Sequence, residues 1–472
     1  MTDSTSSFTR RNILRGALFT AAAVPFGVTL ASCATGSGDD EETSADTETS
    51  AGTSDNPFGI EEGAAVDAVI FNGGYGVDYV EFAADIFNEM WGGAAVVSPS
   101  TEISSELQPR FVGGNPPDLV DNSGAQSIGF NSILDQLEDL ESVLDAPNLE
   151  GTVIRETLVG EAILDSGRFD GKLAAINYVL TMYGVWYSGS LFDTNGWTAP
   201  TTWDEAYALG EEAKKQDKFL FLFGKEAATY YQTLALDSAI KQGGDDVRLP
   251  LENLEADAYS NDVLQEVFEQ MKRIIDAGFM KPGGSGTQFT AAQAQWSLDQ
   301  AALLYPSGSW IENEMKDNTA DDFQMMGINT PTVDASPVLP VTALHAEAGE
   351  PFIIPSQAAN VAGGKELLRI MLSKEAASNF SKTKLAPTVI RDTVPEDGFG
   401  STALLSQSQI LAAAGSDTFT YKFNGLYGLN TEQLVVWNSF LEGDTSVADL
   451  TSGLQGIADN ARETQEVIPV TE

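Results

Sequence analysis

The stretch AVDAVIF at residues 65–71, which runs into NGGYG at residues 72–76, decides the fold. Seven mostly apolar residues have the length of a buried strand, and the glycines that follow end it. From residue 77 to residue 90 the apolar side chains recur at helical spacing. A strand that leads through a glycine-rich turn into a helix is the first half of a βαβ unit.

The same alternation continues directly afterwards. Residues 94–97 have the pattern of a second strand, residues 102–111 that of a second helix, and residues 117–121 that of a third strand. Strands that alternate with helices in units of about 25 to 30 residues predict an α/β fold with a parallel sheet.

Candidate ligand-binding residues follow these strands, because ligands of such sheets bind beyond the carboxyl ends of the strands. Gly74 and Tyr75 follow the first strand, and the third is followed by Asp121, Asn122 and Ser123. The glycine-rich loop lacks the G-x-G-x-x-G spacing of dinucleotide sites, so we interpret it as backbone opened for a neutral ligand. For the three polar residues, a turn cap is the alternative role.

The N-terminus indicates export. Arg10 and Arg11 precede an uncharged apolar run over residues 16–31, which is shorter than the ~20 residues that cross a bilayer. The tetrapeptide that ends at Cys33 resembles the lipobox of bacterial lipoproteins, in which the cysteine is acylated. We therefore expect residues 1–32 to be a twin-arginine-like signal peptide and Cys33 to carry lipid. Removal of this cysteine with an ordinary signal peptide is the alternative.

An acidic linker is expected after the lipidated cysteine, over residues 33–57. Residues 34–56 contain no aromatic or large aliphatic side chain, so they cannot bury enough apolar surface to offset the entropy of ordering. Repulsion among the acidic side chains extends such a linker. About 415 residues remain, which suits two lobes better than one core.

The formal net charge of −44 makes nucleic acid and anionic lipid poor partners. We interpret the charge as a solubility feature of an exported or salt-adapted protein, with an acidic docking patch as the alternative. Cys33 is the only cysteine. No intramolecular disulfide can form, and the core must supply the stability.

Four stretches further along the chain carry a family resemblance. They are an extended segment, a helix start with Thr202 as its cap and Glu205 at the capping-box position, a Gly-Ser-Trp motif, and a return strand with its helix: residues 174–188, 200–206, 308–310 and 349–372. These stretches resemble the extracytoplasmic solute-binding proteins of carbohydrate ABC importers.

Five further stretches are similar to members of that family in actinobacteria that bind N-acetylglucosamine and N,N′-diacetylchitobiose: residues 67–83, 107–125, 224–234, 283–297 and 304–317. The resemblance implies a monomeric, lipid-anchored protein on the outer face of the cytoplasmic membrane. Its expected ligand is an amino-sugar mono- or disaccharide, which it delivers to the membrane subunits of an ABC permease.

The resemblance also implies a two-lobed, type II periplasmic-binding-protein fold. Each lobe is expected to be a mainly parallel sheet flanked by helices. Lobe 1 is assigned to residues 58–178 with a return over 344–395, and lobe 2 to residues 179–343 with a C-terminal helical part over 396–472. Hinge crossovers are expected near residues 178–183, 343–347 and 395.

A sugar site needs an aromatic plate for the ring face and a few aimed polar groups. Trp310, Trp296 and Tyr75 are the candidate plates, and the polar candidates beyond residues 121–123 are Thr181 and the Tyr178 hydroxyl. Core packing is the alternative for Trp310, and core and cleft are equal alternatives for Trp296.

An enzyme is the less favoured class. His345 is the only histidine, so the chain has no cluster of the His and Cys ligands that zinc or copper prefer. We expect no catalytic residues, no metal and no cofactor. A glycosidase needs only two carboxylates and stays an alternative, as does a chitin-binding lectin. Turnover of a chitobiose substrate would distinguish the glycosidase.

Overall fold

The computed structural model describes residues 53–471. The predicted signal peptide, Cys33 and most of the predicted linker lie outside the described residues. None of the helices in the described part is both long and apolar enough for a membrane span.

The strands form one eight-stranded sheet and a separate two-stranded one. In the larger sheet the order is β2-β1-β3-β9-β6-β7, with β10 beside β9 and β8 beside β6, and β4 pairs with β5. The bounds are β1 Ala65–Phe71, β2 Ala94–Ser100, β3 Leu119–Asp121, β4 Arg168–Phe169, β5 Lys172–Leu173, β6 Ile176–Ser188, β7 Leu304–Gly308, β8 Met325–Ile328, β9 Leu344–Ile353 and β10 Thr418–Phe419.

The α-helices are α1 Asp78–Trp91, α2 Ile103–Val112, α3 Glu141–Leu144, α4 Ile154–Thr157, α5 Gly189–Asn195, α6 Trp203–Lys214, α7 Tyr230–Gly243, α8 Asp245–Glu252, α9 Asp262–Asp276, α10 Phe289–Ser297, α11 Ile311–Met315, α12 Val361–Met371, α13 Lys374–Lys384, α14 Thr402–Ala414, α15 Phe423–Tyr427, α16 Asn430–Leu441 and α17 Val447–Thr464. Short 3₁₀ helices are η1 Phe130–Ser132, η2 Leu134–Gln136, η3 Glu161–Gly167, η4 Lys225–Ala227, η5 Ala258–Ser260, η6 Gly284–Gly286 and η7 Gly398–Gly400.

The first lobe contains the parallel strands that the sequence predicts. β1 pairs in parallel with β2 on one side and β3 on the other. α1 covers this sheet with a face that includes Val80, Ala84 and Phe87, the apolar positions of its helical pattern, and all three are buried. α12 packs beside α1 against the same strands. The alternating apolar pattern therefore produces a layer of parallel strands that helices cover.

The second lobe is organised around the far half of β6. β7 and β8 both pair antiparallel with it, which differs from the mainly parallel sheet that was expected. Among the described residues of this lobe, parallel pairing is limited to β10 with β9 and to bridges outside the named strands, such as Phe219 with Ala302 and Phe221 with Met280. The reason is that β6 enters this lobe as a long strand of 13 residues and offers both of its edges to returning segments.

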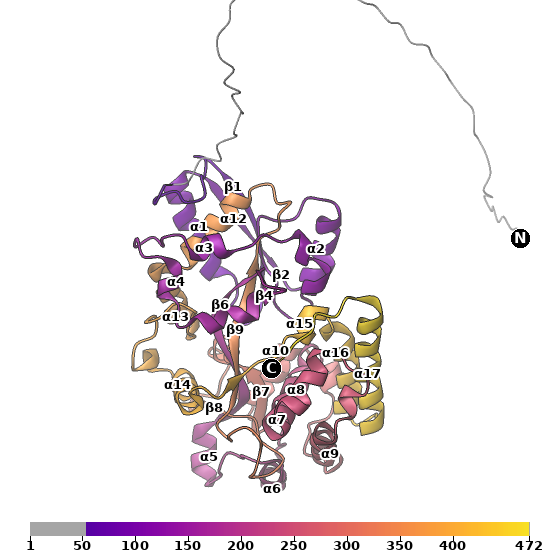
Figure 1. Ribbon diagram of the computed structural model, residues 1–472. Helices are drawn as coiled ribbons and strands as arrows, with labels where there is room; N and C mark the ends of the chain where they lie inside the picture. The colour runs from indigo at the N-terminus through magenta and orange to yellow at the C-terminus, as the bar shows by residue number, and fades with distance from the viewer. Residues whose placement is uncertain (1–52, 472) are drawn as a thin grey trace, which may run out of the picture. The chain divides into compact units, whose positions relative to one another are not determined.

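β6 and β9 pair antiparallel and run between the two lobes (Figure 1). Their register joins Ile176 to Phe352 at one end and Met182 to Ala346 at the other. Two of the segments expected as crossovers therefore lie side by side as one hydrogen-bonded ribbon.

The start of α6 follows the sequence signal closely. The Thr202 side chain accepts a hydrogen bond from the backbone N–H of Glu205, as an N-cap does. The Glu205 carboxylate accepts from the backbone N–H and the hydroxyl of Thr201, at 2.8 Å each. Thr202 is thus confirmed as the N-cap. The Glu205 carboxylate, which in a capping box would bond the backbone N–H of Thr202, bonds Thr201 instead.

Gly364 provides a test of how α12 packs on the sheet. A Cβ at this position would lie 2.0 Å from the carbonyl oxygen of Asp118, so Gly364→Ala should lower the free energy of unfolding by about 1–3 kcal/mol. Gly456 on α17 is the matched control, because a Cβ there has nothing within 4 Å. Gly456→Ala should raise the free energy by about 0.5–1 kcal/mol. Urea unfolding followed by tryptophan fluorescence measures both, and equal stability of the two variants would contradict this packing.

Candidate functional site

The two lobes meet where the loop after β1 reaches the start of α11. A Cβ at Gly74 would lie 2.8 Å from Cδ1 of Trp310, so only a glycine lets the indole approach this closely. The side-chain amide of Asn313 donates a hydrogen bond to the Gly74 carbonyl oxygen. The glycine-rich loop of the first lobe is therefore in direct contact with the Gly-Ser-Trp motif of the second.

Three half-buried aromatic side chains, Tyr183, Tyr230 and Trp310, form one surface, which we call the aromatic wall. The ring of Trp310 lies 5.7 Å from that of Tyr183 and 5.7 Å from that of Tyr230, edge-on in both cases. His345 stacks behind Tyr183 with 4.3 Å between ring centroids. Such edge and stacked contacts fix the orientation of each ring, so the wall is a rigid platform.

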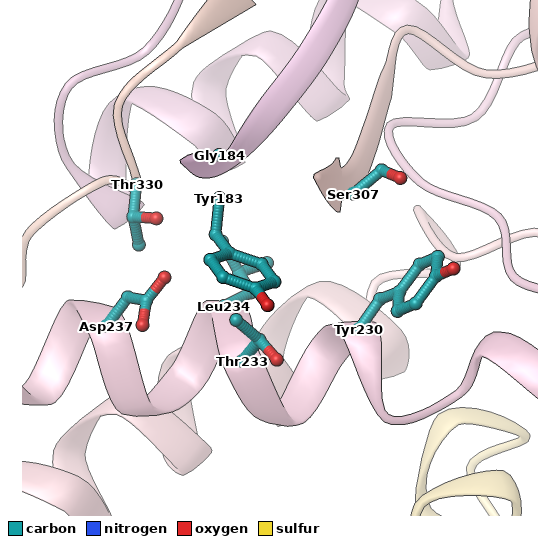
Figure 2. Close-up of a pocket in the computed structure, with 8 residues that line it drawn as sticks. All are labelled: Tyr183, Gly184, Tyr230, Thr233, Leu234, Asp237, Ser307 and Thr330. Atoms are coloured by element: carbon teal, nitrogen blue, oxygen red, sulfur yellow. The ribbon is translucent and has the colours of Figure 1, made fainter. Parts of the chain in front are cut away.

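A small pocket lies behind the aromatic wall, between β6 and α7 (Figure 2). Tyr183, Tyr230, Thr233, Asp237 and Ser307 are among its lining residues, and its volume is ≈ 10 Å³, room for about one water molecule. Two buried atoms of this lining, Oδ2 of Asp237 and Oγ of Ser307, have no hydrogen-bond partner among the described residues.

Acidic side chains of the first lobe lie at the ends of β3 and β9. Asp121 is fully buried, and it accepts hydrogen bonds from the hydroxyls of Ser123 and Tyr79. Burial, with the added charge of Glu350, raises the pKa of Asp121 well above its usual range. Burial also raises the pKa of Glu350. In the folded protein both carboxyl groups therefore favour the protonated, uncharged form more than free side chains do.

Glu350 has an uncommon backbone conformation. Its φ of 55° lies in the left-handed region, which costs free energy in a residue with a side chain. The β6–β9 register joins Asn177 to Pro351 and Val179 to Gly349, with Glu350 between these pairs. Strained residues of this kind concentrate at ligand sites, which marks Glu350 as a site candidate.

Glu314 brings a further carboxyl group from the second lobe. It accepts a hydrogen bond of 2.6 Å from the side-chain amide of Gln293. Burial raises the pKa of Glu314 to about 7, with Glu350 contributing. Because Glu350 contributes to this shift, the two acids lie near one another although they belong to different lobes.

A second cluster of polar side chains surrounds the first residues of β9, where the chain crosses between the lobes. His345 Nδ1 lies 2.8 Å from Oδ1 of Asp237. Burial alone would lower the pKa of His345, but the charges of Asp237 and Glu347 outweigh burial and raise it. The Tyr183 hydroxyl donates to Glu347 at 3.2 Å. The imidazole is therefore part of the support behind the aromatic wall.

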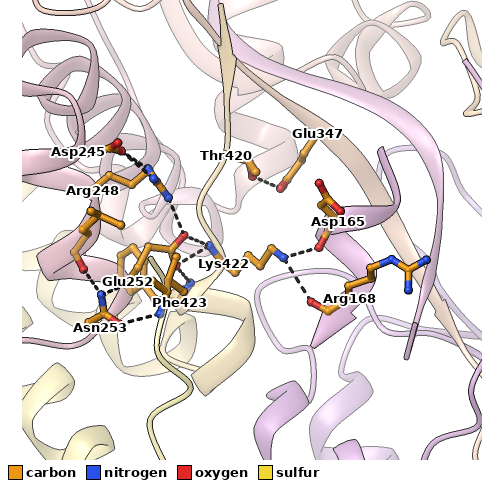
Figure 3. A network of polar contacts seen from close by, with 12 residues as sticks. Asp165, Arg168, Asp245, Arg248, Glu252, Asn253, Glu347, Thr420, Lys422 and Phe423 are labelled. Atoms are coloured by element: carbon orange, nitrogen blue, oxygen red, sulfur yellow. Dashed lines mark hydrogen bonds and ion pairs between the residues drawn. The ribbon is translucent and has the colours of Figure 1, made fainter. Parts of the chain in front are cut away.

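Lys422 links the two lobes beside this group (Figure 3). Its ammonium donates to the carbonyl oxygens of Asp165 and Arg168 in the first lobe. Its backbone N–H donates to the Glu252 carboxylate in the second lobe. Nearby, the Thr420 hydroxyl donates to Glu347 of β9. The contacts of Lys422 and Thr420 thus connect the C-terminal part of the chain with the first lobe and with β9.

Some of the predicted site residues come together where the lobes meet. The set is Gly74 against Trp310, Tyr75 next in the loop, and Asp121 with Ser123 at the end of β3. Tyr75 is buried, with its ring 5.2 Å from Phe380, and its hydroxyl has no hydrogen-bond partner among the described residues. Thr181 is also buried, and a Cβ at Gly349 would lie 2.6 Å from its hydroxyl oxygen.

Three other predicted site residues have side chains that contact partners within a single lobe. Trp296 is 1% exposed and stacks on Tyr305 in the core of the second lobe. The Tyr178 hydroxyl donates to the backbone of Met371 in the first-lobe core. The Asn122 side chain bonds both backbone groups of Ile128 at 2.8 Å and thus caps a turn. The polar groups or ring faces of these three side chains are already used inside the protein, so we leave them out of the proposed site.

Several residues of the interface have no sequence pattern that marks them. Tyr183 is the one recoverable case, because it follows Thr181 by two positions in a strand and so shares its face. Glu350, Glu314 and Asn313 sit among many acids and amides in the chain. These three residues are site candidates because of where the fold places them, and the spacing of residue types along the sequence does not predict that placement.

Comparisons with known proteins identify the family and the fold of the chain. The family model for bacterial extracellular solute-binding proteins matches residues 94–378. The diacetylchitobiose-binding protein NgcE of Streptomyces coelicolor is 54% identical over 468 residues, which cover 99% of each chain. RafE in complex with raffinose superposes with a TM-score of 0.65 at 17% identity, covering 84% of this chain and 100% of that one. A chitin oligosaccharide binding protein gives 0.67 at 15% identity, covering 82% and 95%. The two structures share the fold.

The substitution Glu314→Gln tests whether burial of the Glu314 carboxyl group lowers the stability of the folded protein at high pH. The pKa of the folded parent is about 7 against an ordinary 4.5, so the parent loses stability as the pH rises from 4.5 through 7. Glutamine carries no charge and can still accept the bond from Gln293. The variant should therefore be more stable by about 1–3 kcal/mol at pH 8, and this advantage should vanish below pH 4.5.

Urea unfolding at pH 4, 6 and 8 measures the difference. Glu106→Gln, on the exposed face of α2, is the control and should change stability little at any pH. A Glu314→Gln variant that is less stable than the parent at pH 8 would mean that the carboxylate has a favourable partner.

Proposed function

The chain belongs to the bacterial extracellular solute-binding protein family, and we propose that within it the chain captures N,N′-diacetylchitobiose or N-acetylglucosamine. It then delivers the sugar to the membrane permease of an ABC importer. The 54% identity to a diacetylchitobiose-binding protein over nearly the whole chain supports this ligand class.

The single observation that carries the proposal is the position of Trp310. Its indole lies against Gly74 of the opposite lobe and beside Tyr183 and Tyr230. A pyranose ring has an apolar face that stacks on such a plate, and its hydroxyls need carboxylates and amides at fixed positions. Asp121 and Asn313 supply such groups on the two sides of the interface.

We propose cleft closure as the capture step. A sugar needs a pocket of roughly 300 Å³ or more, whereas the pocket beside the aromatic wall has ≈ 10 Å³. The lobes therefore separate to admit the ligand and close again on it. Because the closed form contacts the sugar from both sides, the ligand shifts the equilibrium toward closure.

We propose that Gly74, Tyr75, Asp121, Ser123, Thr181 and Trp310 contribute to the site, together with Tyr183, Tyr230 and Glu350. The proposal includes no catalytic step. The carboxyl groups bind and orient the sugar, and the captured disaccharide leaves unchanged.

We further propose that the protein is a monomer tethered outside the cell. Lipid on Cys33 holds it to the outer face of the cytoplasmic membrane, and the acidic linker lets the lobes reach the permease. A lipid chain contributes ~0.8 kcal/mol per buried methylene, and two chains give stable anchoring.

Trp310→Ala should weaken binding of N,N′-diacetylchitobiose by well over tenfold, because the aromatic plate is lost. Isothermal titration calorimetry on the purified protein measures this, with cellobiose and maltose as competing sugars that lack the acetamido group. Trp91→Ala is the matched control, since Trp91 ends α1 beside the amino ends of the strands, and it should bind normally.

Two outcomes would contradict the proposal. Unchanged binding in Trp310→Ala would show that the site is misplaced. Equal affinity for cellobiose and the acetylated disaccharide would show that the amino-sugar assignment is wrong.

Cys33→Ala should release the protein from cells into the medium, because no acyl chain can be attached. Fractionation of cells that express the parent and the variant, followed by immunodetection, measures the distribution. Ser32→Ala, which keeps the cysteine, is the control and should stay with the membrane. Membrane retention of the Cys33→Ala protein would contradict lipid anchoring.

A further inference from the structure

We propose that Asp121 and Glu350 act as a proton-sharing carboxyl pair that hydrogen-bonds the captured sugar, so that capture takes up a proton. This inference rests on the proposed sugar-binding function. It adds Glu350 as a specificity-determining residue and couples ligand binding to pH.

The geometry places the two carboxyl groups on neighbouring strands. β3 and β9 pair antiparallel with Asp121 opposite Phe352, and the backbone N–H of Asn122 donates to the Pro351 carbonyl at 2.9 Å. Glu350 directly precedes Pro351 in β9. The Ser123 hydroxyl donates to Asp121, and both Ser123 and Asp121 are close enough to Glu350 to influence its pKa.

The surroundings offer these acids no positive charge. Asp121 is faced by Tyr79 of α1, Ser123 and Glu350. Glu350 is also close enough to influence Glu314 of α11, Tyr183 of β6, and Tyr75 and Tyr230. In the part of the chain that the structure describes, no lysine, arginine or histidine forms an ion pair with Asp121, Glu350 or Glu314.

A bound proton is then the simplest way to neutralise one of the two carboxylates. Two adjacent carboxylates in a buried site cannot both stay ionised without a large electrostatic cost. Burial raises the pKa of Asp121 and of Glu350, in agreement with one retained proton. The protonated carboxyl becomes a hydrogen-bond donor, which is what the carbonyl oxygen of an acetamido group requires.

Two independent features indicate that this pair faces a ligand. The first is the left-handed conformation of Glu350, at φ 55° within β9, a strained conformation of the kind that concentrates at ligand sites. The second is the Tyr75 hydroxyl, which belongs to a side chain only 2% exposed and has no partner among the described residues. A sugar hydroxyl between the lobes would satisfy it.

Closure explains why the proton is linked to capture. Glu314 and the aromatic wall come from the second lobe, so they add negative charge and remove water from Glu350 when the lobes meet. The pair therefore holds its proton to a higher pH in the closed, liganded form than in the open form. Affinity is then constant at low pH and falls as the pH rises through the window between the two pKa values, by at most tenfold per pH unit.

Calorimetry of the full chain with N,N′-diacetylchitobiose between pH 5 and pH 8.5 tests this. We expect the dissociation constant to increase with pH. Titrations at one pH in phosphate and in Tris, which differ in ionisation heat, should reveal uptake of up to one proton. Glu350→Gln and Asp121→Asn should each make the pH profile shallower and reduce the uptake, with Glu314, whose pKa burial also raises, accounting for what remains. Glu81→Gln on the exposed face of α1 should leave both unchanged.

The outcomes separate the inference from the function on which it rests. Tight binding of the parent with no pH dependence and no proton exchange overturns the proton-sharing pair and leaves the sugar-binding role intact. Absence of binding to any amino sugar overturns both. Because the parent protein alone gives the proton count, the test holds even if a variant at residue 121 fails to fold.

Discussion

The antiparallel pairing of β6 with β9 is the interaction on which the rest of the structure depends. Both strands pass from one lobe to the other, and their hydrogen bonds from Ile176–Phe352 to Met182–Ala346 keep the two passages in register. One end of β9 pairs with β3, so that Asp121 lies opposite Phe352, two residues beyond Glu350. The far half of β6 carries β7, whose end leads into Trp310. Site residues from distant parts of the sequence therefore meet because one ribbon fixes the strands that precede them.

Local signals predicted local structure well. The apolar run at residues 65–71 became β1, and the Thr202 cap begins α6 as expected. Such features depend on neighbouring residues, so the sequence contains what decides them. Trp310 was recoverable because two small residues precede it and leave room for its indole, which contacts both Gly308 and Gly74.

The remaining site residues depend on contacts between distant segments. Trp296 and Trp310 are chemically identical, and only the packing of Tyr305 and Phe323 around Trp296 makes it a core residue. The importance of Glu350 depends on its backbone conformation and on Asp121, which lies on another strand. The antiparallel second lobe was missed for the same reason, since pairing direction follows from where a strand returns and not from its composition.

The described body, residues 53–471, contains no cysteine, and its interior is held by noncovalent contacts, which are apolar packing, hydrogen bonds and ion pairs such as Arg369 with Glu366. A fold of this kind has no covalent step that depends on an oxidant. The chain can reach the same native state in a reducing compartment as in an oxidising one, and reductants leave its stability unchanged. Folding is thereby independent of redox conditions on either side of the membrane.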